Sequence, residues 1–190
     1  MNQSRSKSFS LDRITKIGIL SALSYGLMFI QMPIPIAPPF MKIDLADVPS
    51  LIGGFALGPW AGVMIQLIKN LLNLSKTMTG GVGELSNFIV GSTFVLVSSL
   101  IYRNNKTKKN SILALALGVL AMSAVATISN AFVVFPIYGN AMHMDLEAFA
   151  AMVGKNGMVS NYFTLMVFSI APFNIIKGAV ASVITELVYK

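Results

Sequence analysis

The stretch Phe173-Asn174-Ile175-Ile176-Lys177-Gly178 decides the fold, because it places an amide and an ammonium in the middle of a long apolar segment. Within residues 162–189 the only other charged side chain is Glu186. A lysine at the centre of a membrane-spanning helix costs roughly 2.5 to 3.5 kcal/mol, so it needs a compensating role. Asn174 and Lys177 are three residues apart, which puts them on one helical face. We expect that face to point into the protein.

The composition of the whole chain is that of an integral membrane protein. Of 190 residues, 55% are hydrophobic and 11% are charged, whereas a soluble domain carries about 25% charged residues. With no cysteine and one histidine, the chain offers no thiolate or imidazole cage for a metal, and we expect none. The net charge of +7 arises from residues in short loops beside hydrophobic spans. This pattern indicates orientation in a membrane and no nucleic-acid partner.

The first apolar run, Ile14 to Ile30, follows a basic segment over residues 1–13. Positive charge before a span predicts that this segment stays in the cytoplasm. Within the span, Gly18, Ala22 and Gly26 repeat every four residues, which lets another helix approach closely. The partner of this stripe is either a helix of the same chain or a separate protein.

Residues 48–74 can be one span kinked at Gly58-Pro59 or two short helices that turn there. The next span, residues 85–102, ends in the basic cluster of residues 103–109. Two spans before it place that cluster in the cytoplasm, where positive charge is favoured. We therefore predict a hairpin with arms at residues 48–57 and 60–74, both shorter than the roughly 20 residues of a normal crossing.

The remaining chain predicts two further spans, at residues 112–137 and from Tyr162 onward. An outer segment, residues 138–160, joins them and contains a short amphipathic helix at the interface, residues 144–153. Pro172 removes a backbone hydrogen bond and should kink the last span. The prediction is a single all-α membrane domain over residues 1–190, a bundle of six transmembrane helices with both termini in the cytoplasm.

A long apolar first outer loop covers residues 32–47. Its prolines, together with Pro49, prevent it from being helical, yet it is rich in hydrophobic side chains. A solvated loop does not need so much apolar surface. The loop is either a lid over a site or a connector packed against the protein.

Three polar stripes can be placed by depth in the predicted bundle. Glu84 and Asn87 lie at the outer start of the fourth span, Asn130 lies in the outer half of the fifth, and Asn174 and Lys177 lie near the middle of the sixth. All three can face one cavity that opens to the outside below the proline-rich loop. Such a mixture of an ammonium, a carboxylate and amides among apolar walls suits a flat heteroaromatic molecule with hydroxyl or imide groups.

Each of these polar residues also has a structural interpretation. Asparagines in membrane helices often bond only a neighbouring helix, and Glu84 at a helix start is favoured by the helix dipole. Lys177 and Glu84 could form an ion pair that holds two helices together. The chain contains neither a P-loop nor an H-E-x-x-H sequence, so we expect no enzyme activity and no ATP binding by a P-loop.

The chain resembles the riboflavin-specific S components, the substrate-binding subunits of energy-coupling factor (ECF) vitamin transporters, over nearly its full length. The resemblance rests on the small-residue stripe of the first helix, the loop of residues 33–49 and the Gly58-Pro59 hairpin. It rests further on Gly83-Glu84-Leu85-Ser86-Asn87 and on Asn174-Ile175-Ile176-Lys177-Gly178.

This resemblance implies a multi-pass protein of the cell membrane that captures riboflavin from outside with high affinity. Release inside would be driven by a coupling transmembrane subunit and two ATPase subunits, with no cofactor. The stripe of Gly18, Ala22 and Gly26 would dock the coupling subunit. The implied ligand-binding residues are Glu84, Asn87, Asn130, Asn174 and Lys177, with Phe40, Met41, Leu45 and Asp47 from the loop that would cover the ring.

The alternative is a self-sufficient secondary carrier for a small heteroaromatic solute. In such a carrier, Lys177 or Glu84 would take up and release a proton. Carriers of this kind are often built from internal repeats, and six spans without a visible repeat favour the binding subunit.

Overall fold

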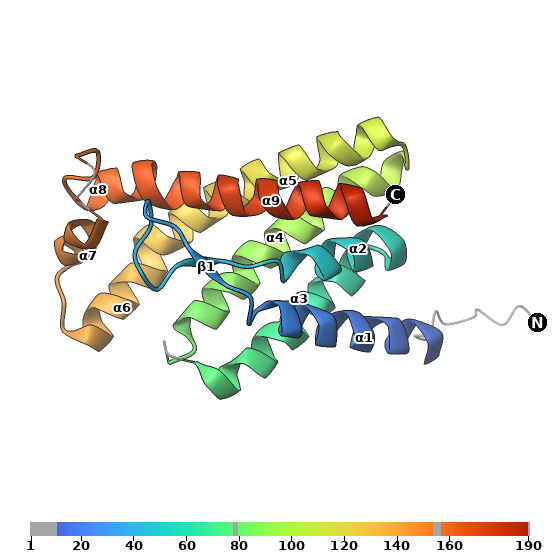
Figure 1. Cartoon of the computed structure of the whole chain (residues 1–190), viewed down its shortest axis with the longest axis horizontal. Helices are drawn as coiled ribbons and strands as arrows, with labels where there is room; N and C mark the ends of the chain where they lie inside the picture. The colour runs from blue at the N-terminus through green and yellow to red at the C-terminus, as the bar shows by residue number, and fades with distance from the viewer. Residues whose placement is uncertain (1–10, 78–79, 154–156, 190) are drawn as a thin grey trace, which may run out of the picture.

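Helices make up nearly all of the structure, a computed structural model that describes residues 11–77, 80–153 and 157–189. In chain order the elements are α1 (Leu11–Leu27), β1 (Met32–Pro33), β2 (Lys42–Ile43), α2 (Asp47–Leu57), α3 (Pro59–Asn73), η1 (Leu74–Lys76), α4 (Val82–Asn104), α5 (Lys108–Ser129), η2 (Asn130–Val134), α6 (Phe135–Met142), α7 (Leu146–Val153), α8 (Tyr162–Leu165), η4 (Met166–Ile170) and α9 (Ala171–Tyr189). Figure 1 shows the helices running roughly along the long axis of the molecule. The prediction of an all-α fold is therefore confirmed.

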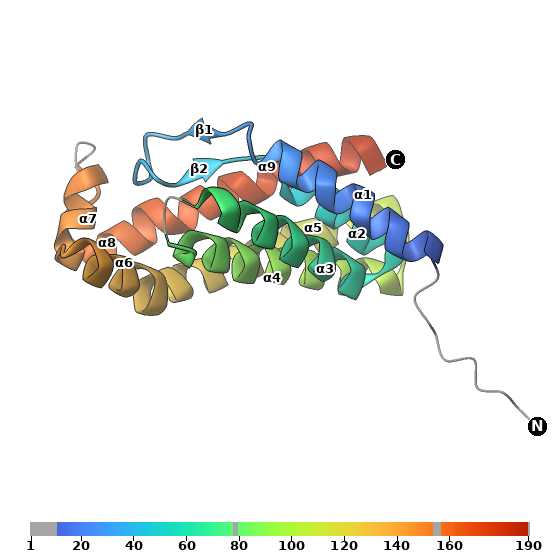
Figure 2. The same ribbon diagram turned by 90° about the horizontal axis from the view of Figure 1, so that it is seen from below.

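The two ends of the bundle differ in what they contain. The start of α1, the turn between α2 and α3, the connection from α4 to α5 and the end of α9 gather at one end, on the right in Figure 1. Elements α6, α7 and α8 lie at the opposite end. In Figure 2, β1 and β2 extend along one side of the bundle beside α9. Of the predicted N-terminal segment 1–13, residues 1–10 lie outside the described part of the chain.

The predicted hairpin is confirmed, with α2 and α3 as its arms. Gly58 joins them with a φ of 104°, a left-handed value that glycine adopts without strain. Pro59 follows at the first position of α3, where its missing N–H costs nothing. A Cβ on Gly62 would lie 2.8 Å from the carbonyl oxygen of Ser50. The absence of that Cβ is what lets the two arms pack so closely.

Two long helices each change to π-helix just before a proline. Segment η2 precedes Pro136, and η4 precedes Pro172. A proline ring clashes with the carbonyl of the residue four positions earlier, and both of these residues, Phe132 and Phe168, lie inside the π segments. The predicted distortion at Pro172 is thus present as a widened turn. The fifth predicted span also continues beyond residue 137, because α6 ends at Met142.

Among the described residues, three helical stretches are long and apolar enough to cross a membrane by length and composition: Val82–Asn104, Lys108–Met142 and Tyr162–Tyr189. Large apolar side chains face outward on them, such as Phe132 at 78% and Leu187 at 76% exposure. A surface of this kind is matched by lipid and not by water. The remaining helices are shorter, with 17 residues in α1, 11 in α2 and 15 in α3.

Helix α7 lies within the predicted outer segment 138–160, close to the predicted helix at residues 144–153. It buries Phe149, Ala150 and Val153, and they join a hydrophobic cluster with Phe135 and Tyr138. The helix therefore packs on the end of the bundle. Its position at the membrane interface stays a prediction, and residues 154–156 of the segment lie outside the described chain.

Candidate ligand-binding site

A cavity of about 750 Å³ lies between the loop of residues 32–47 and the helices, with Tyr138 of α6 and Met152 of α7 among its lining residues. Its wall is built from the proline-rich loop, the end of α3, the start of α4, the η2 and α6 segments and the middle of α9. Apolar side chains, including Val90, Val134, Tyr138 and Phe173, alternate with polar ones. This volume and mixture are typical of pockets that enclose small organic ligands.

The proline-rich loop (residues 32–47) forms one side of the cavity. It folds back on itself through the antiparallel pair of β1 and β2, and the Ser169 hydroxyl donates to the carbonyl oxygen of Ile36 at 2.6 Å. The ring of Phe40 lies 5.5 Å from that of Tyr138 and 6.0 Å from that of Phe135. The loop is therefore packed against the helices and also contributes Phe40 and Met41 to the cavity wall.

Lys177 lies at the floor of the cavity and is held by the segment that leads into α2. Its Nζ atom is 3.4 Å from Asp44 Oδ2 and 3.7 Å from Asp47 Oδ2, and it donates to Asn87 Oδ1 at 3.2 Å. The lysine side chain is 9% exposed. These two carboxylates offset the cost of placing an ammonium in the apolar interior.

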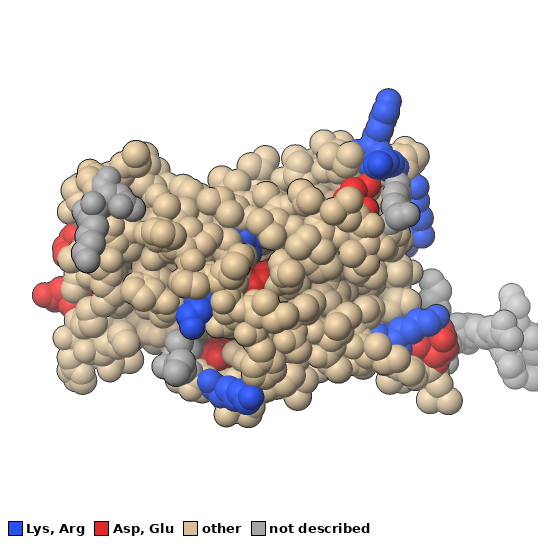
Figure 3. All heavy atoms as spheres, in the orientation of Figure 1, with Lys and Arg blue, Asp and Glu red and all other residues tan. Residues whose placement is uncertain are grey.

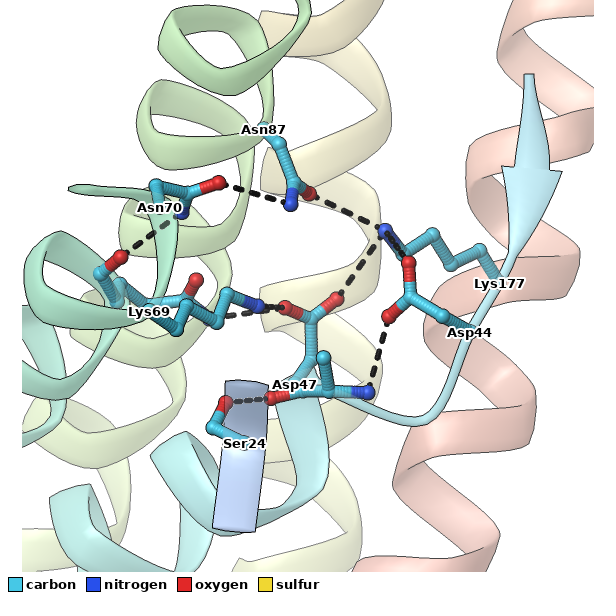
Figure 4. A network of polar contacts seen from close by, with 9 residues as sticks. Ser24, Asp44, Asp47, Lys69, Asn70, Asn87 and Lys177 are labelled. Carbon is cyan, nitrogen blue, oxygen red and sulfur yellow. Dashed lines mark hydrogen bonds and ion pairs between the residues drawn. The ribbon is translucent and has the colours of Figure 1, made fainter. Parts of the chain in front are cut away.

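Asp47 connects this floor to α3, as Figure 4 shows. Its Oδ1 accepts hydrogen bonds from Lys69 Nζ at 2.7 Å and from Gln66 Nε2 at 2.9 Å. Lys69 is fully buried, with no exposed side-chain surface. The two lysines and the aspartates Asp44 and Asp47 form a group without net charge, which is the condition for burying so many ionised groups together.

Glu84 is bound elsewhere, so the suggested ion pair between Lys177 and Glu84 is wrong. The carboxylate lies in the first turn of α4 and accepts from Asn73 Nδ2 and from Thr77 Oγ1, each at 2.9 Å. Lys177 instead takes its counterions from the proline-rich loop. Glu84 remains on the cavity wall, held in place by the turn between α3 and α4.

Asn130 and Asn174 each use one half of the side-chain amide within their own helix. The Asn130 amide donates to the carbonyl of Ala126 at 2.7 Å, and that of Asn174 donates to Ile170 at 2.8 Å. Both side chains line the cavity. The oxygen of each amide is an acceptor that these bonds do not use. The helices thus fix two acceptors at the wall.

The structure brings most of the predicted site residues together. Seven of them line the cavity: Phe40, Met41, Glu84, Asn87, Asn130, Asn174 and Lys177. Leu45 and Asp47 are absent from the lining residues. Asp47 is turned toward α3, where its contacts with Lys69 and Gln66 keep it 1% exposed.

Several lining residues were missed by sequence reasoning, above all Asp44, Asn70, Asn73 and Lys76. Asn70 accepts from Asn87 Nδ2 at 3.1 Å, which extends the polar floor onto α3. A signal for this helix was present, because Lys69 is an ionisable residue inside a predicted span, and such residues mark functional positions. An ammonium at Lys69 carries the same kind of cost inside a span as the one at Lys177.

The predicted docking stripe faces away from the rest of the chain. Gly18, Ala22 and Gly26 are exposed, and a Cβ at either glycine would meet nothing within 4 Å. The opposite face of α1 is the buried one, with Ser21 at 1% and Ser24 at 0% exposure. No described helix of this chain packs on the stripe, so internal packing does not explain it.

Known proteins resemble this chain over nearly its full length. Residues 12–189 match the family described as "ECF transporter, substrate-specific component". The chain is 39% identical to the riboflavin transporter RibU of Staphylococcus aureus over 94% of its own length and 88% of the relative's. It is 31% identical to the riboflavin transporter FmnP of Bacillus subtilis, with 94% and 90% coverage.

A solved structure shares the fold. It is described as the S component of a bacterial ECF transporter and superposes with a TM-score of 0.76 at 38% identity, covering 94% of this chain and 93% of the other. The family expected from the sequence is confirmed by these matches. The chain belongs to the substrate-specific S components of ECF transporters, which are transport subunits and not enzymes.

Proposed function

We propose that this chain is the riboflavin-binding subunit of an ECF-type vitamin uptake transporter, and that the ligand lies in the 750 Å³ cavity. The observation that carries the proposal is this cavity, with its apolar walls and its buried polar floor around Lys177. The names of the relatives as riboflavin transporters support the choice of ligand.

The cavity wall matches the chemistry of a flavin. Apolar side chains such as Val90 and Phe173 can hold a flat ring, while fixed polar groups orient it. The amide oxygens of Asn130 and Asn174 accept from an imide N–H or from ribityl hydroxyls, and Lys177 donates to a ring carbonyl. Leu45 and Asp47 contribute indirectly in this proposal, by shaping the loop that covers the ring.

We infer six crossings of the cell membrane, by α1, α2, α3, α4, the α5–α6 helix and the α8–α9 helix, in one membrane domain over residues 1–190. Basic residues support this topology, because the connection from α4 to α5, with Arg103, Lys106, Lys108 and Lys109, lies at the end where α1 begins and α9 ends (Figure 1), and Figure 3 shows basic side chains at that end. Positive charge favours the cytoplasm. This orientation puts both termini inside and opens the cavity to the outside.

The partners in this proposal are the coupling transmembrane subunit of the transporter and two ATPase subunits. The exposed stripe of Gly18, Ala22 and Gly26 is where the coupling subunit docks, because small residues let a partner helix approach its backbone closely. The chain captures riboflavin outside and releases it inside when the partners act.

Two measurements on the purified chain test the proposal. The first is the flavin absorption and fluorescence of protein purified from riboflavin-fed cells. We expect one bound flavin per protein molecule. A colourless protein that also fails to bind added riboflavin would show that riboflavin is not the ligand. The second is riboflavin uptake into vesicles. The binding subunit alone should transport nothing, whereas gradient-driven uptake without partners would establish the secondary carrier instead.

A further inference from the structure

A second pocket, of about 400 Å³, lies at the end of the molecule where α2 turns into α3. Three cations line it from three places in the chain: Arg13 on α1, Arg103 at the end of α4 and Lys106 in the connection to α5. Among the described residues, no aspartate or glutamate lines this pocket. An anion inside it would therefore meet three formal positive charges and no formal negative charge among the described lining residues.

The protein fixes part of this wall. Arg13 Nη2 donates to the carbonyl oxygen of Leu57 at 2.7 Å, which holds the guanidinium against the end of α2. Helix α3 starts at the pocket with the positive end of its dipole, whereas α2 and α4 end there with the negative ends of theirs, so the attraction for an anion comes from the side-chain cations. Ser99 also lines the pocket, and its buried hydroxyl has no hydrogen-bond partner within the described chain.

The rim of the pocket carries Trp60, which is 70% exposed. Exposed tryptophans of membrane proteins prefer the level of the lipid headgroups. The connection from α4 to α5, whose residues 103–109 include four basic ones, lies at the same end of the molecule (Figure 1). The pocket therefore lies where phosphate groups of the bilayer are within reach of its cations.

We propose that this pocket binds a phosphate-bearing anion, supplied by the headgroup of an anionic phospholipid in the cytoplasmic leaflet. Guanidinium groups from two helices and an ammonium from the connection between α4 and α5, with the start of α3 beside them, are groups that bind phosphate. Basic pockets between helices on the cytoplasmic side bind anionic headgroups for this reason. The choice of leaflet rests on the orientation proposed above, whereas the choice of phosphate rests on the lining alone.

Trp60 is the only tryptophan of the chain, so its fluorescence reports on this pocket directly. The test titrates the full-length protein, free of riboflavin in a neutral detergent, with phosphatidylglycerol, phosphatidylcholine or inorganic phosphate. We expect a saturable fluorescence change with phosphatidylglycerol and a much weaker one with phosphatidylcholine. A response to inorganic phosphate at equal concentration would keep the phosphate site and replace the lipid by the free ion as its source.

Two double variants that lose the same amount of positive charge distinguish binding of the lipid in the pocket from a general electrostatic attraction to the basic end of the protein. Arg103→Gln with Lys106→Gln removes two lining cations and should weaken phosphatidylglycerol binding about 30-fold, or about fivefold per cation. Lys108→Gln with Lys109→Gln changes exposed residues outside the lining and should weaken it less than about threefold.

Equal weakening in both double variants, or no saturable response to phosphatidylglycerol and phosphate, would overturn the inference. Riboflavin binding is measured in parallel on the same proteins. The pocket and the cavity share no lining residue, so both double variants should bind riboflavin as the parent does. A chain that binds the lipid but not riboflavin would overturn the proposed function and leave this site standing.

Discussion

Two lysines of this protein lie beside the same aspartate, and their surroundings differ. Lys69 has no exposed side-chain surface and contacts Asp47 at 2.7 Å. Lys177 is 9% exposed, lies 3.4 Å from Asp44 and 3.7 Å from Asp47, and lines the cavity. Lys69 is sealed in the interior and is not among the residues that line the cavity, so it does not face a ligand there. The more loosely held Lys177 has an ammonium that can exchange a protein contact for a ligand contact.

This contrast shows how a membrane protein can present a charged group to a ligand. A lone ammonium at this depth would be costly, so the protein supplies carboxylates from the proline-rich loop. If both lysines were held equally tightly, neither could turn to a ligand without breaking a short ion pair. The contact with the buried Lys69 holds the Asp47 carboxylate in place. Asp47 in turn serves as a counterion for Lys177 at the floor of the cavity. We therefore assign stability to Lys69 and ligand binding to Lys177.

The largest expected effect follows from removing the sealed lysine. Lys69→Met leaves the buried Asp47 with the Gln66 amide and with Lys177 as its more distant counterion, and should lower the free energy of unfolding by about 3–5 kcal/mol. Chemical unfolding in detergent measures it. The matched control is Lys108→Met, which changes an exposed lysine and should shift this free energy by less than about 0.5 kcal/mol. A Lys69 variant that is as stable as the control would show that Lys69 does not stabilise the fold.

The next effect falls on ligand affinity. Lys177→Met removes a charged donor from the cavity, which should weaken riboflavin binding by about 10- to 150-fold. Its cost in unfolding free energy should be smaller than that of Lys69→Met, because Asp47 keeps Lys69 and Asp44 lies at the cavity wall. Fluorescence titration of riboflavin gives the affinity. If riboflavin affinity were unchanged and the free energy of unfolding fell strongly, Lys177 would have the same stabilising role as Lys69 and no role in ligand binding.

A smaller loss of affinity is expected when an acceptor is removed next to the lysine. Asn174→Ala and Asn130→Ala each delete one neutral acceptor from the cavity, so each should weaken riboflavin binding about fivefold. Ser123→Ala is the control, because the Ser123 hydroxyl bonds the Ala171 carbonyl between two helices at 3.0 Å and does not line the cavity. Equal affinities in all three variants would restrict ligand recognition to the charged floor.

Sequence reasoning reached much of this arrangement, because helical spacing and charge are local signals. The hairpin at Gly58, the polar stripes and the position of Lys177 follow from residues that are near one another in the chain. The partner of Lys177 does not, since Asp44 is 133 positions away. Both Asp44 and Glu84 are carboxylates near the outer surface of the predicted bundle, and only the path of the proline-rich loop decides between them.

The sealed lysine was overlooked for a related reason. Lys69 lies near the end of a short amphipathic helix, where a lysine often reaches water by extending its side chain. That it instead points inward depends on Asp47 at the start of α2, a contact that needs both arms of the hairpin in place. The sequence pattern also does not predict the π-helical turns before Pro136 and Pro172, because a proline predicts that a helix is distorted but not which form the distortion takes.

The smallest effect on the isolated chain is expected far from both lysines, on the exposed face of α1. Ala22→Leu adds bulk where no described helix of the chain makes contact, so the free energy of unfolding should change by less than about 0.5 kcal/mol, with riboflavin affinity unchanged. Assembly with the coupling subunit should fail, because the larger side chain keeps a partner helix from close approach. Co-purification with the coupling subunit measures this.

Ala124→Leu is the matched control, since Ala124 is an exposed alanine on α5, outside the stripe. It should assemble normally, which separates a specific loss of docking from a general effect of bulk on the lipid-facing surface. Normal assembly of the Ala22 variant would move the docking surface away from the stripe. Loss of riboflavin affinity in that variant would show instead that α1 is coupled to the cavity. In that case Ser24, whose hydroxyl donates to the carbonyl of Ala46 next to Asp47, is the connection that would carry the effect to Lys177.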